Sequence, residues 1–358
     1  MSLRTEQLIT SQSKTMELEE LMQESIDIQE KDFYSRKFYY SYSSLNKLFW
    51  NPQVFYQMYV LGLKEEKTDA HLVQGKLIHL LLLEPEKFAE NFILSPATLP
   101  TGNLRVVIDR VYRHHAELSR NGDQREKLDE FQNAILDVMK DMAYHQSLKT
   151  DQQRIDKILT AEAYSYWNFL KTKGNKTLVD QETYNFCDSA VEIIKTNKEV
   201  CRLIGCDSTE FDNRQVINEA VFSVDLPGKS YGFKGIIDNI VVDHDNKTIY
   251  INDIKTTSKD LKDFPESVEY YSYWMQCVMY MIMAGMHFNQ LMEHEGYQVK
   301  FHFVVIDRAY QTYAFPVTES TMSKWLDRFA KAIETAEWHY VNRSYDLPYE
   351  FAKGLVAL

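Results

Sequence analysis

The sequence is poor in cysteine and lacks the spacings with which cysteines build metal or redox sites. Four cysteines occur among 358 residues, and no two of them form a Cys-x-x-Cys pair. This excludes the patterns typical of zinc ribbons and thioredoxin-like centres. An iron–sulfur cluster would need all four thiols brought together from separate parts of the fold. We therefore expect reduced, buried thiols, as is usual in the cytoplasm.

Long apolar runs are also missing. No stretch reaches the roughly 18 residues that a membrane-spanning helix needs, and the first residues carry no signal-peptide pattern. Gly228-Lys229-Ser230 ends like a phosphate-binding P-loop, but Ser223 stands where that motif requires glycine, so no ATP-driven motor is indicated. We expect a soluble, cytoplasmic protein with no membrane partner.

A net positive charge is absent as well, which at first argues against a nucleic-acid ligand. The formal net charge is −12, and residues 17–32 hold a dense run of carboxylates. Charges are screened beyond about 8 Å at physiological salt, however, so local basic patches decide binding. Residues 149–176 combine Lys and Arg with aromatic residues such as Tyr166 and Trp167. This composition suits a nucleic-acid backbone, although a solvated helix is the more frequent explanation.

Helical periodicity dominates the first 210 residues. A helix is predicted over 41–61, beginning at Ser43 or Ser44. The apolar run 72–83 predicts a buried helix, which Pro85 would bring to an end. From about residue 105 to residue 204 helical periodicity dominates, and we find no convincing strand.

Alternating, β-branched segments follow after residue 210. We expect strands at 216–226, 229–242, 248–255, 300–307 and 311–317, and helices at 266–285 and 318–340. The combination predicts an α/β fold in which helices flank a small mixed sheet.

The domain organisation follows from these segments. Residues 1–35 are polar and acidic and are expected to form a mobile or helical arm. The remainder, 36–345, is predicted to be a single domain. Its parts are a helical insertion at about 100–210, a sheet core at about 216–317 and a closing helix at 318–340.

Each of three predicted strands carries one carboxylate among aliphatic neighbours on the same face. Strand faces alternate with a period of two, and burying an unpaired carboxylate is costly, so such positions indicate a function. The predicted faces are Ile217, Glu219 and Val221; Ile236, Asp238, Ile240 and Val242; and Ile249, Ile251, Asp253 and Lys255.

The turn between the second and third of these strands brings two carboxylates together. A hairpin centred between Asp245 and Asn246 places Asp238 opposite Asp253, with Cβ atoms roughly 5 Å apart. Two like charges about 4 Å apart repel by about 4 kcal/mol at an effective dielectric of 20, so a proton or a cation is needed. Oxygen ligands suit Mg²⁺ or Mn²⁺. Lys255 projects on the same side, where it would orient a water or stabilise a phosphorane; a plain salt bridge at a sheet end is the alternative.

Two other polar groups are assigned to structure rather than to chemistry. Asp243-His244-Asp245 lies at the predicted hairpin tip, where aspartates serve the turn. His114-His115 is expected on a solvated helix face.

Several short segments occur together in an order typical of one group of nucleases. The central ones are Gly235-Ile-Ile-Asp238, a hairpin, and Asp253-Ile-Lys255-Thr256-Thr257. The others are Tyr40-Ser-Tyr-Ser-Ser-Leu45, Gly75-Lys-Leu-Ile-His79 followed by Glu84-Pro85, and Gln276-Cys-Val-Met-Tyr280. The central segments resemble the core of the PD-(D/E)XK nuclease superfamily, and the full set, over about residues 40–315, is most similar to its RecE-type (exonuclease VIII-like) phage and prophage exonucleases. The sequence departs from the superfamily pattern at Ile237, where a proline is usual, and at Asp253, where glutamate is commoner.

The resemblance implies a restriction-endonuclease-like core with one or two Mg²⁺ or Mn²⁺ ions. The ligands that it implies are His79, Asp238, Asp253 and the backbone carbonyl of Ile254, with Glu219 in a weaker role. Lys255 would position or activate the attacking water, while Gln276 and Tyr280 would contact the scissile strand or brace the site.

The resemblance also implies a substrate and partners. The substrate would be linear double-stranded DNA, degraded processively from 5′ ends to leave 3′ single-stranded tails. A single-strand annealing protein and a homo-oligomeric ring around DNA are expected. The candidate DNA contacts are Ser44, Lys171, Lys173 and Lys176. The alternatives are a single-strand or structure-specific endonuclease on the same core, or a catalytically inactive DNA-binding protein.

Overall fold

The computed structural model describes residues 23, 25–63, 70–96, 99–209 and 212–356. The chain divides into two compact units, which we describe separately: a larger unit (residues 1–83 and 189–358) and a smaller unit (Glu84–Asp188). Among the described residues, no helix has both the length and the apolar composition that crossing a membrane requires.

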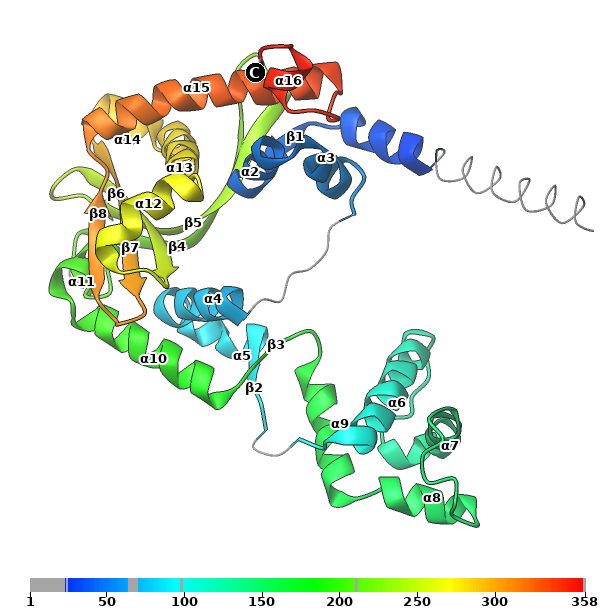
Figure 1. The fold of residues 1–358 in the computed structure, drawn as a ribbon. Coiled ribbons are helices and arrows are strands. Elements are labelled where there is room, and N and C mark those ends of the chain that lie inside the picture. The colour runs from blue at the N-terminus through cyan, green and yellow to red at the C-terminus, as the bar shows by residue number, and fades with distance from the viewer. Residues whose placement is uncertain (1–22, 24, 64–69, 97–98, 210–211, 357–358) are drawn as a thin grey trace, which may run out of the picture. The chain divides into compact units, whose positions relative to one another are not determined.

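The larger unit is built on a mixed six-stranded sheet (Figure 1). Its strands are β1 (Phe38–Tyr40), β4 (Arg214–Asp225), β5 (Tyr231–Asp243), β6 (Thr248–Thr257), β7 (Gln298–Asp307) and β8 (Thr312–Pro316). Strand β5 pairs with β4 along one edge, and along the other edge with β1 at its start and with β6 at its end. The β1–β5 and β6–β7 pairs are parallel and the remaining pairs are antiparallel. The predicted α/β fold with a mixed sheet flanked by helices is confirmed.

Helices cover both faces of this sheet. The helical segments of the larger unit are residues 25–35, α2 (Tyr42–Trp50), α3 (Pro52–Phe55), the π-helical η1 (Tyr56–Val60), α4 (Ala70–Leu83), the second half of α10 (Gln181–Thr196), α11 (Lys198–Ile204), η4 (Leu261–Asp263), α12 (Phe264–Tyr270), α13 (Tyr273–His287), α14 (Asn289–Glu295), α15 (Glu319–Asn342) and α16 (Tyr349–Ala352). Helix α13 is apolar nearly all round and is buried against β4, β5 and β7, as expected for a helix of that composition. Helix α11 packs against β5, β6 and β8 on the opposite face.

Two helices that were predicted as continuous are interrupted. The 41–61 helix is capped by Ser41 rather than by Ser43 or Ser44, and its first part, α2, ends at Trp50. The extended residue Asn51 follows, and its side-chain oxygen caps α3 by accepting hydrogen bonds from the amides of Gln53 and Val54. The 266–285 helix divides into α12 and α13 at Ser272, which has a left-handed φ of 58°. Apolar periodicity continues through both breaks, so it did not reveal them.

The boundaries of the predicted helical insertion differ from those of the smaller unit. The unit begins at Glu84 and ends within α10, so that α11 belongs to the larger unit. The reason is that α11 is bound to the sheet: its carbonyl oxygens at Leu203 and Ile204 accept hydrogen bonds from buried asparagines of β6 and β5. At the other end of the chain, Phe33 is buried in the core of the larger unit. The last turn of the predicted acidic arm therefore belongs to the domain.

The smaller unit is mainly helical. It contains η2 (Pro85–Lys87), α5 (Phe88–Asn91), α6 (Gly102–Arg120), η3 (Leu128–Phe131), α7 (Gln132–Asp141), α8 (Asp151–Ile158), α9 (Ala161–Lys173) and the first half of α10. It also contains a short parallel pair, β2 (Phe92–Leu94) with β3 (Thr177–Val179). Strand β3 lies in the stretch 105–204, where no strand was expected. Three residues per strand are too few for alternation to stand out from a helical pattern.

The core of the smaller unit contains side chains for which exposure was expected. Tyr166 and Trp167 of α9 are buried with Val107 and Ile108 of α6, so these two aromatics are packing residues rather than stacking platforms. His115 is also buried beside Trp167, which makes the predicted solvated position wrong for this histidine. Cys187, Cys201 and Cys277 are buried as expected, whereas Cys206 is exposed.

Candidate active site

The β5–β6 hairpin has the predicted register. Five residue pairs join the two strands, from Asp243 with Thr248 to Asn239 with Asn252. The pairing of β5 with β6 ends at Asn239 and Asn252, one residue before Asp238 and Asp253. On the same edge of β5, strand β1 pairs only with residues 231–233, so residues 234–238 of β5 have no strand partner on that edge within the described part of the chain. In the interval the Asp238 carboxylate replaces a backbone partner, because its Oδ2 accepts a hydrogen bond of 2.7 Å from the amide nitrogen of Ile254.

The alternation of faces changes at the two acidic residues of β4 and β5. Glu219 has a left-handed φ of 48°, which is uncommon for a residue with a side chain. Before Asp238 the core-facing residues of β5 are Phe233 and Ile237; after it they are Ile240 and Val242. The predicted faces are therefore wrong at Val221 and Ile236, which are exposed. Simple period-two counting fails here because both strands change face at the site.

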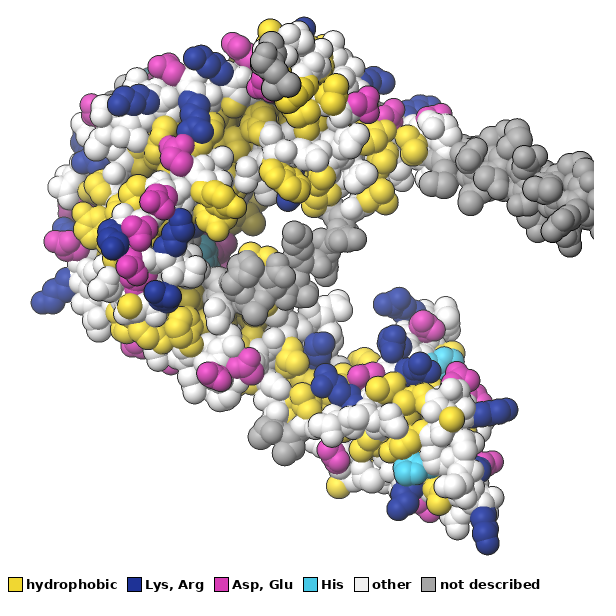
Figure 2. All heavy atoms as spheres, in the orientation of Figure 1, with side chains coloured by type: hydrophobic (Ala, Val, Ile, Leu, Met, Phe, Trp, Pro, Cys, Tyr) yellow, Lys and Arg dark blue, Asp and Glu magenta, His cyan; other side chains and the backbone are white. Residues whose placement is uncertain are grey.

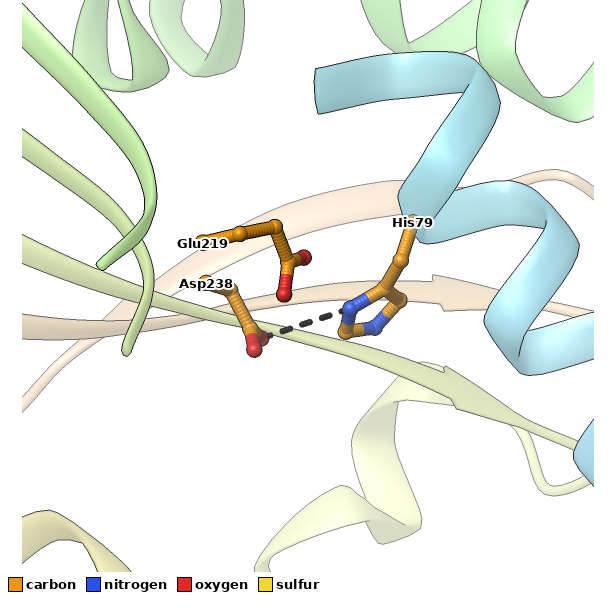
Figure 3. A group of neighbouring side chains, drawn as sticks. All are labelled: His79, Glu219 and Asp238. Atoms are coloured by element: carbon orange, nitrogen blue, oxygen red, sulfur yellow. Dashed lines mark ion pairs between the residues drawn. The ribbon is translucent and has the colours of Figure 1, made fainter. Parts of the chain in front are cut away.

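Three side chains from separate elements converge at this point (Figure 3). His79 of α4, Glu219 of β4 and Asp238 of β5 each place one ligand atom within 4.8 Å of the others. His79 Nδ1 lies 3.7 Å from Asp238 Oδ2, and His79 Nε2 lies 2.8 Å from the carbonyl oxygen of Ile254. The structure thus places His79, Asp238 and the Ile254 carbonyl close together, and Glu219, for which a weaker role was predicted, lies in the same group.

Asp253 lies next to this group and is 0% exposed. Its two carboxylate oxygens accept no well-formed hydrogen bond from the described residues, and its partner is the Lys255 ammonium, with Nζ 2.6 Å from Oδ2. Burial raises the pKa of the Asp253 carboxyl to about 6, against the opposing effect of Lys255. A buried carboxylate with free lone pairs beside two further carboxylates is a strong cation ligand.

Lys255 is held in its charged form. Burial by itself lowers the pKa of this ammonium, but the Asp253 and Asp238 carboxylates outweigh burial and leave the pKa raised. The ammonium also lies 5.0 Å from the centre of the Tyr273 ring, a cation–π contact. The raised pKa favours the charged ammonium, which can orient a water or stabilise negative charge; its part in catalysis stays a prediction.

Gln276 and Tyr280 of α13 form a pair next to the carboxylates. Gln276 Nε2 donates a 2.9 Å hydrogen bond to the Tyr280 hydroxyl, and both residues are buried. Burial first, and then the charges of Asp253 and Asp238, raise the pKa of the Tyr280 phenol well above its usual range. The pair is therefore close enough for the carboxylates to act on it electrostatically. Both predicted roles, contact with the scissile strand and bracing of the site, stay predictions.

The comparison with known families agrees with this geometry. The family model of the PD-(D/E)XK nuclease superfamily matches residues 39–341. The chain belongs to the PD-(D/E)XK nuclease superfamily. Its members hydrolyse phosphodiester bonds and use divalent metal ions.

Similar solved structures are distant from this PD-(D/E)XK chain. A crystal structure of a "Putative exonuclease" from Eubacterium rectale is 12% identical and covers 86% of this chain and 81% of its own, with a TM-score of 0.41. The crystal structure of SSO0001 is 19% identical and covers 42% of this chain and 66% of its own, with a TM-score of 0.20. Among the curated proteins, none matches this chain.

The residues present fit the divalent ion that PD-(D/E)XK nucleases use. The donor set consists of carboxylate oxygens, a backbone carbonyl and one imidazole, and hard cations such as Mg²⁺ and Mn²⁺ prefer oxygen. The unsatisfied oxygens of Asp253 lie beside this set. One neighbouring ammonium does not offset three carboxylates, so either a proton or a cation balances the pocket, and a divalent ion fits the oxygen donors.

The structure gives little support to the predicted DNA contacts of this PD-(D/E)XK chain. Ser44 is buried, and its hydroxyl is used in the capping box of α2, so the structure gives a structural role for this side chain, and a DNA contact stays a prediction. Lys171 forms a 2.5 Å ion pair with Glu126. On the visible face of the larger unit, the described Lys and Arg side chains are interspersed with Asp and Glu and form no continuous basic stripe (Figure 2).

Three asparagines behind the site were missed by the sequence reasoning. Asn218, Asn239 and Asn252 lie in direct register on β4, β5 and β6, each adjacent in sequence to one of the three acids. Their amides form a chain, with Asn252 Nδ2 donating to Asn239 Oδ1 (2.7 Å) and Asn239 Nδ2 to Asn218 Oδ1 (2.8 Å). Asn218 Nδ2 then donates to the carbonyl of Leu83 at the end of α4. We call this chain the asparagine ladder.

The ladder holds the backbone that carries the metal ligands. It also ties the end of α4, and with it His79, to the sheet, while the second amide hydrogens of Asn239 and Asn252 bind α11. The repeated asparagine beside each acid was a visible signal. Its meaning depended on the β4–β5 register, which the sequence did not reveal.

Replacing Asn239 with alanine is expected to lower the free energy of unfolding by about 3 kcal/mol, because it leaves several buried polar groups without a partner. Denaturant unfolding of the full chain measures this. The control is Asn213→Ala, which removes an exposed hydrogen bond to Asp245 and is expected to cost about 0.5 kcal/mol. Equal losses in the two variants would contradict a structural role for the ladder.

Proposed function

We propose that this protein is a divalent-metal-dependent exonuclease of the RecE type that hydrolyses linear double-stranded DNA. The observation that carries the proposal is the convergence of His79, Glu219 and Asp238 beside the buried Asp253–Lys255 pair. The histidine on α4 and the Gln276–Tyr280 pair on α13 support the narrower assignment, because both occupy the segments on which the RecE-type resemblance rests.

Each residue of the site has a defined part in the proposed reaction. The residues that would hold the metal are His79, Asp238, Asp253 and the Ile254 carbonyl, together with Glu219. A bound divalent ion lowers the pKa of a coordinated water and offsets negative charge on the phosphate. The Lys255 ammonium, held charged by Asp253, stabilises the additional negative charge that develops on the phosphorane.

The polarity and the partners are part of the same proposal. The enzyme would act processively from 5′ ends in the cytoplasm and leave 3′ tails for a single-strand annealing protein, in phage-type recombination. Copies of the chain would form a closed ring around DNA. Within residues 149–176, Lys171, Lys173 and Lys176 are the candidate contacts to the DNA backbone, and DNA would compete with Glu126 for Lys171.

A comparison of DNA topologies tests the exonuclease proposal. With Mg²⁺, linear duplex labelled at one 5′ end should lose its label early, whereas a duplex labelled at a 3′ end should lose it late. A covalently closed circle should remain intact, since it offers no end. Cutting of the circle would indicate an endonuclease on the same core. A folded protein that degrades no DNA with Mg²⁺ or Mn²⁺ would indicate an inactive DNA-binding protein.

A further inference from the structure

Two neighbouring tyrosines project into solvent beside the site. Tyr270 is 79% exposed and Tyr271 is 47% exposed, at the junction of α12 and α13. Their rings form an edge-to-face pair with centroids 4.9 Å apart. Aromatic rings contribute most when they are covered, so two adjacent exposed rings suggest a surface that is covered by a ligand.

The backbone that carries these rings is held in place. The carbonyl oxygen of Tyr271 accepts hydrogen bonds from the Tyr42 hydroxyl and from Asn46 Nδ2, both on α2. The following residue, Ser272, has the left-handed conformation that separates α12 from α13. This turn therefore presents the rings in a defined position, as a binding surface requires.

A short chain of ring contacts links the tyrosines to Lys255. The Tyr271 ring stacks on the Tyr273 ring, with centroids 5.4 Å apart and planes at 27°. The Lys255 ammonium lies 5.0 Å from the Tyr273 ring. The ring of Tyr273 therefore lies between the exposed ring of Tyr271 and the ammonium of Lys255.

The strands that carry the acids also expose apolar side chains. Val221 is 77% exposed and Ile236 is 48% exposed, and they are paired across β4 and β5. Each lies two residues from an acid, Glu219 and Asp238 respectively. The surroundings of the site therefore include apolar and aromatic surface, which suits the faces of nucleobases better than it suits phosphates.

We propose that Tyr270 and Tyr271 form a stacking subsite for a nucleobase of the strand being cut, next to the scissile phosphate. Inside a duplex both faces of each base are stacked on its neighbours, and only a terminal base has an open face. We therefore place the base at the DNA end in this subsite, where fraying frees its second face and its edges. The inference rests on the proposed function and deepens it: the substrate engaged at the site is a locally single-stranded DNA end. Two tyrosines supply a sequence-tolerant contact, because every base has a π face.

Binding without hydrolysis tests the subsite. DNA carrying the fluorescent base 2-aminopurine at its 5′ end is titrated with the full chain in EDTA, as a single strand and as a blunt duplex. We expect the wild type to quench the fluorescence of the single strand by stacking. Tyr270→Ala and Tyr271→Ala are expected to weaken this binding by about 5- to 100-fold. Tyr271→Phe keeps the ring and should bind like the wild type.

The matched control is Tyr313→Ala, which removes an exposed tyrosine from β8 and should leave binding unchanged. Wild-type affinity and quenching in both alanine variants would overturn the subsite. The subsite would also be overturned if the alanine variants changed the self-association of the chain, measured by sedimentation, without changing DNA binding. In that case the tyrosines would join copies of the chain. If the wild type binds and quenches the strand but hydrolyses no DNA with Mg²⁺, the subsite stands and the proposed function fails. If the wild type hydrolyses DNA with Mg²⁺ but both alanine variants bind and quench the strand as the wild type does, the proposed function stands and the subsite fails.

Discussion

Replacing Lys255 with alanine is expected to lower the rate of DNA hydrolysis by about 10²- to 10³-fold, the effect of removing one group that stabilises charge in a transition state. The expectation rests on the ion pair with Asp253, which keeps the ammonium charged and directed toward the carboxylates. Asp253→Ala should lose at least as much, because it removes a proposed ligand and the partner of the lysine. The measurement is the digestion of end-labelled linear duplex with Mg²⁺, compared with the wild type.

The control for this prediction is Lys259→Ala, four residues along the chain, where an exposed lysine pairs with exposed Glu266. Its rate should stay within about twofold of the wild type, since exposed ion pairs contribute little. Lys255→Met retains most of the side-chain length without the charge and separates the loss of charge from the loss of packing. If the Ala variants of Lys255 and Asp253 both cut as fast as the wild type, the assigned site is wrong.

Removing divalent metal is expected to abolish hydrolysis and to destabilise the larger unit. A ligand at about 100 times its dissociation constant adds about 2.7 kcal/mol to the free energy of unfolding, which corresponds to a rise in Tm of roughly 5–10 °C. The gain arises because the fold holds Glu219, Asp238 and Asp253 close together and a cation relieves their repulsion. Thermal unfolding in EDTA and with added Mg²⁺ or Mn²⁺ measures the shift.

Asp238→Asn is expected to lose most of this metal-induced shift. The asparagine can still accept the hydrogen bond from the Ile254 amide, so the fold should be retained while a charged ligand is lost. Asp225→Asn, at an exposed position on β4 that pairs with Lys37, should keep the full shift. An equal rise in Tm in all three proteins would place the ion elsewhere.

Much of the site was accessible from the sequence because it depends on local structure. The β5–β6 hairpin has a short turn, in which Asp243 accepts hydrogen bonds from Asn246, and a short turn sets the register of the strands that it joins. That register, with the spacing of Asp253 and Lys255 on one strand, was sufficient to predict a pocket beside Asp238. The order of the motif segments then predicted the superfamily, which the family comparison confirms.

Other features depended on contacts between residues far apart in the chain. Tyr166 and Trp167 looked like candidates for nucleic-acid stacking until packing against α6 placed them in a core. The exposed tyrosines that we propose for that role occur instead at a helix break that apolar periodicity did not reveal. Composition alone does not distinguish a buried aromatic residue from an exposed one.

By itself, the sequence determined the mixed sheet, its central hairpin and the Asp238, Asp253 and Lys255 constellation, because alternation and turn chemistry act over a few residues. The tertiary structure decided that Glu219 joins His79 and Asp238, since this requires a left-handed backbone at Glu219 and a change of face in two strands. It also decided that the asparagine ladder supports the acids, because three strands must lie in register before their amides meet. The change of backbone at Glu219 has no short-range signal, and the asparagine beside each acid acquires its meaning only from the register of the strands, since both features are set by where distant segments pack.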